Sequence, residues 1–270
     1  MVTQMFKQFF GMKTNTFDKE IQTGEMFKGD DVRELESRLR HMLECRGIFL
    51  LVGEAGSGKT AALRMFTNAL GASLYRPLYL PLTTLTVNDF YSALISMLGD
   101  SPKFRKIDMF RQIQSAIKTL YFEQRITPVL VIDEVHMSSC AILEDLRMLF
   151  NFNMDSVDPL ILILAGQPLI RNKLALNVCA PLRQRITSRY SMKGFSLHET
   201  AEYLSTRMVQ AGVNRAVFTE QAVASIHSCS SGLPRNINNI VTHALTYCAW
   251  KKLDMVDEEA VYQANIEISA

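Results

Sequence analysis

The chain has 270 residues, of which 48% are hydrophobic and 21% are charged, and its formal net charge is +2. These values are typical of a globular protein with a sizeable core in one large or two modest domains, and so small a charge does not by itself indicate a polyanionic partner. The five cysteines are scattered and lack Cys-x-x-Cys spacing, which predicts reduced thiols, no zinc site and a cytoplasmic location. Because the longest apolar runs are far too short to span a bilayer, we expect no membrane partner.

Residues 1–30 set four phenylalanines among polar residues, namely Phe6, Phe9, Phe10 and Phe17. Because aromatic rings are unfavourable in water, we expect this segment to be an arm that packs on the main domain. An interfacial membrane helix is the alternative, and the lack of a strongly basic face counts against it.

Hydrophobic periodicity predicts alternating helices and strands from residue 31 to residue 196. The expected strands cover residues 47–52, 75–80, 128–132 and 160–165. Helices are expected from Asp31, from Lys59 to about residue 70, after Thr86, from about Lys103, and around residues 142–149. The third and fourth strands are continuously apolar, as are strands buried on both faces of a parallel sheet. We therefore predict the α/β class, with a parallel sheet and helices on both faces.

Residues 197–270 show only helical periodicity, with helices expected near residues 201–208, 219–228 and 237–248 and a last one from about Asp257. We expect a small all-helical lid domain here. The predicted domains are thus the arm (1–30), the α/β domain (31–196) and the lid domain (197–270).

A glycine-rich segment follows the first predicted strand and precedes a helix, and it reads Gly53-Glu54-Ala55-Gly56-Ser57-Gly58-Lys59-Thr60. A strand, a glycine-rich turn and a helix in this order make a P-loop, whose backbone N–H groups cradle phosphates. We expect Lys59 to reach the β- and γ-phosphates of ATP and the Thr60 hydroxyl to bind Mg²⁺. A turn that is rich in glycine for reasons of fold alone is the alternative, and the strand and helix beside it count against that alternative.

The predicted strand at 128–132 is followed by Asp133 and Glu134, and the next core strand is followed by Gln167. Ligands of open α/β sheets bind at the carboxyl ends of the strands, so we expect these side chains to lie beside the P-loop. Asp133 is then expected to hold Mg²⁺, and Glu134 to orient and deprotonate the water that attacks the γ-phosphate. Gln167 fits a contact with the γ-phosphate or with that water. Helix capping is the alternative for all three residues.

Residues 171–215 carry eight basic residues against two acidic ones. Because the donor fork of arginine suits phosphate recognition, one of these arginines is a candidate arginine finger for a neighbouring subunit's nucleotide, and a solvated basic face is the alternative. Further along, Arg235 follows Pro234 at a predicted helix start. A cation is unfavourable there unless an anion is bound, so Arg235 is a candidate γ-phosphate sensor.

The P-loop, the acidic strand end, the polar strand tip, the arginine-rich segment and the Gly-x-Pro-Arg of the helical domain together resemble an AAA+ ATPase over about residues 31–250. A further resemblance, to the Ser-Arg finger box of clamp loaders and initiators, is carried by Arg185-Ile186-Thr187-Ser188-Arg189-Tyr190. The resemblance implies that Arg189 is the finger, with Arg185 second, and that Gln167 and Arg235 occupy the sensor 1 and sensor 2 positions. It also implies a homo-oligomer, as a ring or a helical filament, with ATP between subunits.

More specifically, the chain resembles the ExeA-type ATPases in three segments: Phe9-Phe10-Gly11-Met12 with Phe17, Ala165-Gly166-Gln167-Pro168, and Leu182-Arg183-Gln184-Arg185-Ile186. That group includes secretion ATPases and, with the TniB and TnsC proteins, ATPases encoded beside transposases. Secretion members look longer, with a membrane segment and a cell-wall-binding region. This sequence contains neither, so we expect the transposition branch.

The resemblance thus implies an ATPase that assembles on double-stranded DNA in its ATP form and helps a transposase, or another transposition protein, to select its target. Hydrolysis then disassembles the complex. Candidate contacts to DNA phosphates are Lys103, Arg105 and Lys106 at the start of a predicted helix, with a solvated turn as the alternative. A secretion-type ATPase adaptor without a DNA role is the main alternative function, and a replication-type initiator or loader is a third.

Overall fold

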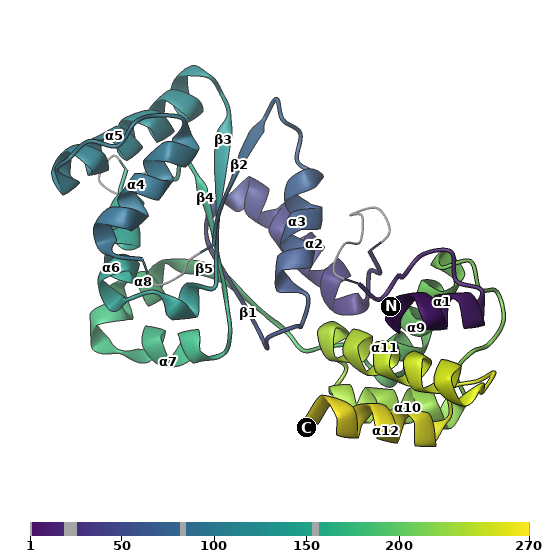
Figure 1. Cartoon of the computed structure of the whole chain (residues 1–270). Coiled ribbons are helices and arrows are strands. Elements are labelled where there is room, and N and C mark those ends of the chain that lie inside the picture. Colours follow the sequence, from purple (N-terminus) through teal and green to yellow (C-terminus); the bar gives the residue numbers. More distant parts are fainter. Residues whose placement is uncertain (1, 19–25, 82–84, 153–156, 270) are drawn as a thin grey trace. The chain divides into compact units, whose positions relative to one another are not determined.

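The computed structural model describes residues 2–18, 26–81, 85–152 and 157–269. It divides into two compact units (Figure 1). The α/β unit comprises Glu34–Glu54 and Lys59–Met192, and the helical unit comprises Met1–Arg33, Ala55–Gly58 and Lys193–Ala270. The change from one unit to the other at Met192 lies close to the boundary expected at residue 196.

A parallel sheet of five strands, in the order β2-β3-β4-β1-β5, forms the centre of the α/β unit. The strands are β1 (Gly47–Gly53), β2 (Tyr75–Pro81), β3 (Thr127–Asp133), β4 (Ile161–Gly166) and β5 (Ile186–Met192). Every residue of β1, β3 and β4 is buried, which is why these strands are apolar except for Thr127 and Asp133 at the two ends of β3. The predicted parallel sheet is confirmed.

Helices cover both faces of this sheet, as predicted. Figure 1 shows α4 to α8 on one face and α2 and α3 on the other. Their bounds are α2 (Asp30–Cys45), α3 (Lys59–Asn68), α4 (Val87–Leu98), α5 (Lys106–Lys118), α6 (Cys140–Leu149), α7 (Leu169–Ala175) and α8 (Ala180–Arg185). Short turns of other helix types lie at Thr119–Glu123 (η2, a π-helix), Val135–Met137 (η3) and Asn177–Cys179 (η5). Helix α4 begins at Thr86 with a capping box that Asp89 completes.

The edge strand β5 is not among the strands expected from the sequence. Ile186, Tyr190 and Met192 are buried, whereas Thr187 and Arg189 between them are exposed. This alternation is typical of a strand with one solvated face, and a run of polar residues hides it from a search for apolar strands.

The helical unit contains α1 (Val2–Phe10), α9 (Leu197–Gln210), α10 (Glu220–Ser230), α11 (Pro234–Lys251) and α12 (Glu258–Ser269). A capping box of Ser196 and Glu199 begins α9, and the Glu199 carboxylate also accepts the backbone N–H of Asp30 at 2.7 Å. Burial alone would raise the pKa of Glu199, but the backbone hydrogen bonds from Ser196 and Asp30 outweigh it and hold that pKa below its usual value. The hydrogen bonds that cap the start of α9 therefore depend on the ionised form of Glu199.

The N-terminal arm packs in the helical unit. Its apolar side chains Phe6, Phe10, Met12 and Phe17 belong to the buried core of that unit, together with residues of α9, α10, α11 and α12. Thr16 Oγ1 donates a hydrogen bond to the Arg207 carbonyl at 2.8 Å. The prediction that this arm packs on the main, α/β domain is therefore wrong, because the helices of the second unit supply the apolar surface that its aromatic rings cover. Residues 19–25 of the predicted arm lie outside the described residues.

None of the helices in the described part of the chain is long and apolar enough to cross a membrane.

Candidate nucleotide-binding site

Three predicted site segments follow three neighbouring strands. The P-loop follows β1, Gln167 follows β4, and Asp133 is the last residue of β3. Because the sheet is parallel and β4 lies between β1 and β3, these carboxyl ends lie side by side at one edge of the sheet. The arrangement puts Gln167 just after the strand that lies between the P-loop strand and the acidic strand.

The P-loop backbone has the conformation that a phosphate cradle needs. Gly56 and Gly58 have φ angles of +84° and +94°, which favour glycine. The Ser57 hydroxyl is buried and has no hydrogen-bond partner among the described residues. Lys59 is only 5% exposed, and its Nζ donates to the carbonyls of Gly53 and Glu54, both at 2.8 Å. An unpartnered buried hydroxyl in a loop of this shape fits a bound phosphate.

Thr60 and Asp133, the two predicted metal ligands, are brought together. The Thr60 hydroxyl donates to Asp133 Oδ2 at 2.6 Å, across 73 positions of sequence. Asp133 is 2% exposed, and its other oxygen accepts the backbone N–H of Glu134 at 2.9 Å. A hydroxyl and a carboxylate beside a P-loop are the donor set by which P-loop proteins hold Mg²⁺, so the residues fit that ion.

Tyr79, on β2, is a further residue of this site that the sequence analysis missed. Its hydroxyl donates to Asp133 Oδ2 at 3.1 Å. Burial and then the Asp133 carboxylate raise the pKa of Tyr79 to about 12, so the phenol stays protonated and keeps donating. The sequence signal for Tyr79 is the two-residue repeat of a strand. Leu78 and Leu80 are buried on one face of the sheet, and Tyr79 between them points to the opposite face.

Glu134 has a left-handed backbone with φ 56° and ψ 31°, which is rare for a residue other than glycine. It precedes the short helix η3 but makes no side-chain capping hydrogen bond. Its side chain is 44% exposed, and Oε2 lies 3.4 Å from Nδ1 of His136. The capping alternative is therefore not supported for Glu134, whose carboxylate lies partly open to solvent.

Gln167 is half-buried, and its backbone N–H donates to His136 Nδ1 at 3.3 Å. His136, like Tyr79, was not predicted as a site residue. Its sequence signal is its position, two residues after Glu134 at the acidic strand end.

The two candidate finger arginines differ in environment. Arg189 lies on the edge strand β5, is exposed, and donates to the Arg183 carbonyl at 3.0 Å. With Arg171 and Arg183 it lines a cavity of about 320 Å³ whose floor is apolar and includes Leu50 of β1. The side chain of Arg185 is half-buried and donates to the Arg147 carbonyl at 3.1 Å.

Arg235 contacts the P-loop within the helical unit. It is the second residue of α11, after Pro234, as the sequence predicts. Its backbone N–H donates to the Gly56 carbonyl at 3.3 Å. A Cβ at Gly56 would lie 2.8 Å from the Cβ of Arg235, so only glycine permits this approach.

The three candidate DNA contacts fall into two kinds. Lys103 and Arg105 are exposed, on the segment that joins α4 to α5. Lys106 instead forms an ion pair at 2.8 Å with Asp145 of α6, whose side chain is only 9% exposed. The structure thus gives Lys106 a structural contact in the α/β unit.

This fold and this strand-end site define a P-loop nucleotide-binding protein with the AAA+ fold. Residues 41–174 match the model of the family described as AAA domain. The matched segment runs from α2 to α7 and includes the P-loop, and it covers just under half of the 270 residues.

Among characterised proteins, the chain is similar to General secretion pathway protein A of Aeromonas hydrophila, with 30% identity over 247 residues. The match covers 89% of this chain and 44% of that protein, so the chain spans less than half of the relative's length. Among solved structures, the ORC2 protein of Aeropyrum pernix has a TM-score of 0.66 at 16% identity and matches over 96% of this chain and 72% of its own. Drosophila ORC bound to DNA has a TM-score of 0.70 at 16% identity, over 98% and 66% of the two chains. At this level of identity the structures show the shared AAA+ fold.

Proposed function

We propose that the chain is a DNA-binding, oligomeric AAA+ ATPase of the cytoplasm that regulates DNA transposition, by target selection or transposase recruitment. ATP binding assembles it, and hydrolysis disassembles the complex. The observation that carries the ATPase assignment is the 2.6 Å hydrogen bond between Thr60 and Asp133, with Glu134 directly beside it. A protein that only binds nucleotide needs no carboxylate at the position of Glu134.

In this proposal Glu134 is the general base toward the attacking water, and Gln167 orients the γ-phosphate or that water. Thr60 and Asp133 hold Mg²⁺, which neutralises charge on the phosphates when bound. Lys59→Ala is expected to lose nucleotide binding and assembly together. Glu134→Gln is expected to bind ATP, to hydrolyse it slowly and to trap the assembled state. A Glu134→Gln variant that turns over ATP at the wild-type rate would contradict the role of Glu134.

The arginine-rich cavity supports a composite site, in which one subunit supplies Arg189 to the nucleotide of the next. Arg189 is the stronger candidate because it is exposed on an edge strand, whereas Arg185 is half-buried against a carbonyl of α6. Arg235, as sensor 2, couples the helical unit to the bound nucleotide.

A mixing experiment tests this composite site. Arg189→Ala and Glu134→Gln are each expected to hydrolyse ATP slowly as homo-oligomers. Mixed together, they are expected to regain hydrolysis, because some interfaces then combine an intact base with an intact finger. Arg185→Ala mixed with Glu134→Gln serves as the control. Mixtures no more active than their components would refute a finger supplied by the neighbour.

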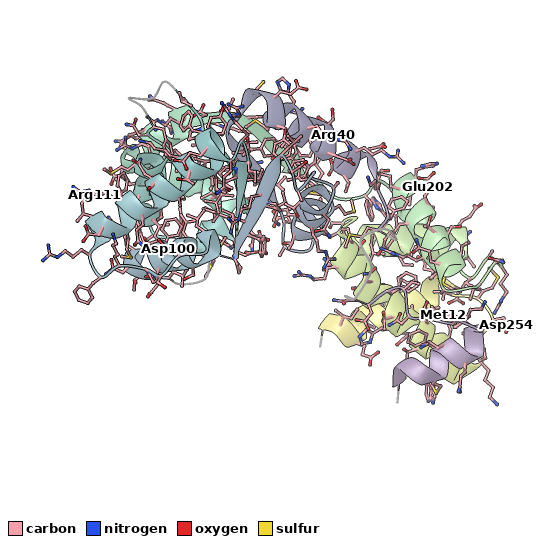
Figure 2. The ribbon with its side chains drawn as sticks, turned by 90° about the horizontal axis from the view of Figure 1, so that it is seen from above. Met12, Arg40, Asp100, Arg111, Glu202 and Asp254 are labelled. Atoms are coloured by element: carbon pink, nitrogen blue, oxygen red, sulfur yellow. The ribbon has the colours of Figure 1, made fainter. Side chains whose placement is uncertain are left out.

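The exposed basic segment between α4 and α5 supports DNA as the partner. Phe104 is 99% exposed and stands between Lys103 and Arg105. Gln112 of α5 fixes the segment by accepting the Lys103 N–H at 3.0 Å and donating to Asp100 at 2.9 Å. Asp100 and Arg111, labelled in Figure 2, mark the end of the α/β unit at which this segment lies. An exposed aromatic ring between two cations suits a duplex, with the cations on phosphates and the ring against the groove.

Double charge reversal, Lys103→Glu with Arg105→Glu, tests this contact. It is expected to weaken duplex binding and to reduce the slope of log affinity against log salt by about 2, with ATP binding retained. Reversal of two other exposed cations of the α/β unit, Arg40→Glu with Lys118→Glu, is the matched control. Equal DNA affinity in the test and control variants would refute the contact.

The similarity to General secretion pathway protein A favours a second candidate, a secretion-type ATPase adaptor without a DNA role. The two functions differ in the response to DNA. Transposition predicts ATPase activity that duplex DNA stimulates and filaments or rings that form on DNA with a non-hydrolysable ATP analogue. ATPase activity that is indifferent to DNA, with no assembly on it in electron micrographs, would favour the secretion adaptor.

A further inference from the structure

His136 is a buried histidine that the proposed chemistry does not yet use. It lies in the short helix η3, two residues after Glu134, and is 6% exposed. Its Nδ1 atom meets groups from two different strand ends: Oε2 of Glu134 at 3.4 Å, after β3, and the backbone N–H of Gln167 at 3.3 Å, after β4.

One ring nitrogen cannot serve both groups at once. When Nδ1 carries a hydrogen it can donate to the Glu134 carboxylate, but it then has no lone pair for the Gln167 N–H. When Nδ1 carries no hydrogen it accepts from Gln167, and the carboxylate then faces a lone pair instead of a donor. The two contacts are therefore alternatives, and the choice between them fixes how firmly Glu134 is held.

The surrounding backbone keeps the ring at this branch point. Lys173 of α7 donates through Nζ to the Ser138 carbonyl at 2.7 Å, and the Ser138 hydroxyl donates to the Val135 carbonyl at 2.6 Å. Gly166, the last residue of β4, lets the η3 backbone approach closely, because a Cβ there would lie 3.1 Å from Val135 Cγ1 and 3.2 Å from the His136 backbone nitrogen. The distances at Nδ1 are thus imposed by η3 and β4 together.

We propose that His136 is a positioning residue that couples the strand tip at Gln167 to the general base Glu134. While Nδ1 carries the ring hydrogen, it donates to the carboxylate and Glu134 is restrained. When that hydrogen moves to Nε2 by exchange with water, Nδ1 accepts from the Gln167 N–H, and the carboxylate is released to take a proton from the attacking water. A shift of the Gln167 backbone on nucleotide binding is thereby transmitted to Glu134 through one atom. This inference rests on the proposed role of Glu134 in hydrolysis.

Substitutions that differ in where they carry a polar atom test the role of Nδ1. His136→Asn keeps a polar atom near the position of Nδ1, His136→Gln moves it toward that of Nε2, and His136→Leu removes it. We expect all three to bind a fluorescent ATP analogue as the wild type does. His136→Asn should retain most of the turnover number, and the other two should lose about tenfold, as for a misplaced catalytic group. Equal turnover in all three variants, or lost nucleotide affinity, would overturn the proposal.

A double-mutant cycle separates this inference from the proposed function. If His136 acts through Glu134, His136→Leu has no further effect on turnover in the Glu134→Gln background. Additive losses would overturn the positioning role while leaving Glu134 as the base. A Glu134→Gln variant with wild-type turnover would instead refute the proposed role of Glu134.

A spectroscopic readout needs no turnover at all. With ¹⁵N-labelled histidine, the Nδ1 resonance that disappears in His136→Leu is assigned to His136. We expect this resonance to move in Glu134→Gln, because Nδ1 loses its charged neighbour, and to move again when the nucleotide analogue binds to the wild type. A resonance that changes in neither case would refute the coupling, whether or not the chain hydrolyses ATP.

Discussion

The ion pair between Lys106 and Asp145 allows a quantitative test of whether Lys106 stabilises the fold. The test distinguishes Lys106 from Lys103 and Arg105, the candidate DNA contacts on the same segment. The Asp145 carboxylate comes from α6 and its side chain is 9% exposed, whereas the Lys106 side chain is 49% exposed. Lys106 Nζ also lies 5.5 Å from the centre of the Tyr91 ring. Burial and then the Asp145 carboxylate raise the pKa of Tyr91, so its hydroxyl remains protonated beside Asp145.

Lys106→Met keeps most of the aliphatic stem and removes the charge, which leaves a buried carboxylate without its cation. Breaking a fully buried ion pair in this way costs about 3–5 kcal/mol. Because half of Lys106 is solvated and Tyr91 remains as a neighbour, we expect about 1–2 kcal/mol. For a chain of this size the melting temperature should then fall by about 2–8 °C. Lys106→Glu should cost more, because it sets a second negative charge against Asp145.

Thermal and urea unfolding of Lys106→Met measure this loss, with Lys103→Met as the control on the same segment. Asp145→Asn completes a double-mutant cycle, in which the effect of Lys106→Met should shrink. A melting temperature equal to that of the wild type, or an equal loss from Lys103→Met, would refute the reasoning. The result also decides how DNA binding must be tested, since a charge reversal that includes Lys106 would weaken DNA binding by unfolding alone.

Three further perturbations test the fold and the site. Glu199→Gln should lower the melting temperature at pH 7. A lowered pKa of Glu199 stabilises the folded state above the unfolded pKa of about 4.3, and this stabilisation is lost on acidification. The difference in melting temperature between Glu199→Gln and the wild type should therefore vanish near pH 3. A difference that does not depend on pH would contradict this reasoning. Gly56→Ala should weaken ATP-analogue binding, because its Cβ would lie 2.8 Å from that of Arg235; unchanged affinity would show that the loop can shift. Tyr79→Phe should raise the Mg²⁺ concentration needed for nucleotide binding by about tenfold, because it removes a hydrogen bond that orients Asp133, and an unchanged Mg²⁺ titration would remove Tyr79 from the site.

Much of the α/β unit is predictable because its strands are buried on both faces. The central residues of a strand such as β3 must be apolar, and the carboxyl end of the strand is then marked by the first charged residues, Asp133 and Glu134. The P-loop needs glycine at the left-handed positions 56 and 58, so its sequence is constrained by backbone geometry as well as by chemistry. Both signals are local, which is why they can be read without the fold.

The contacts that the sequence analysis missed join segments distant in sequence. Tyr79 meets Asp133 across 54 positions, and Lys106 meets Asp145 across 39. Helix α5 shows the same limit on a smaller scale: it buries Met109, whereas Ile107 at its start is 54% exposed despite fitting the apolar period. Periodicity gives the existence of a helix, but the neighbouring α4 and α6 decide which side of it is buried.

The backbone of Glu134 bears on whether this position serves the fold or the site. A residue other than glycine in the left-handed region carries about 1 kcal/mol of strain, which glycine at the same position would not. Nothing in the described surroundings of the Glu134 side chain recovers that strain by packing, because the side chain is 44% exposed and its carboxylate meets only the shared Nδ1 of His136 at 3.4 Å. The geometry instead turns the chain at the end of β3, so that the Glu134 N–H donates to Asp133 while the Glu134 carboxylate meets His136, whose Nδ1 also accepts the Gln167 N–H. The backbone strain at Glu134 is therefore better explained by chemistry at the strand ends than by a contribution of Glu134 to the stability of the fold.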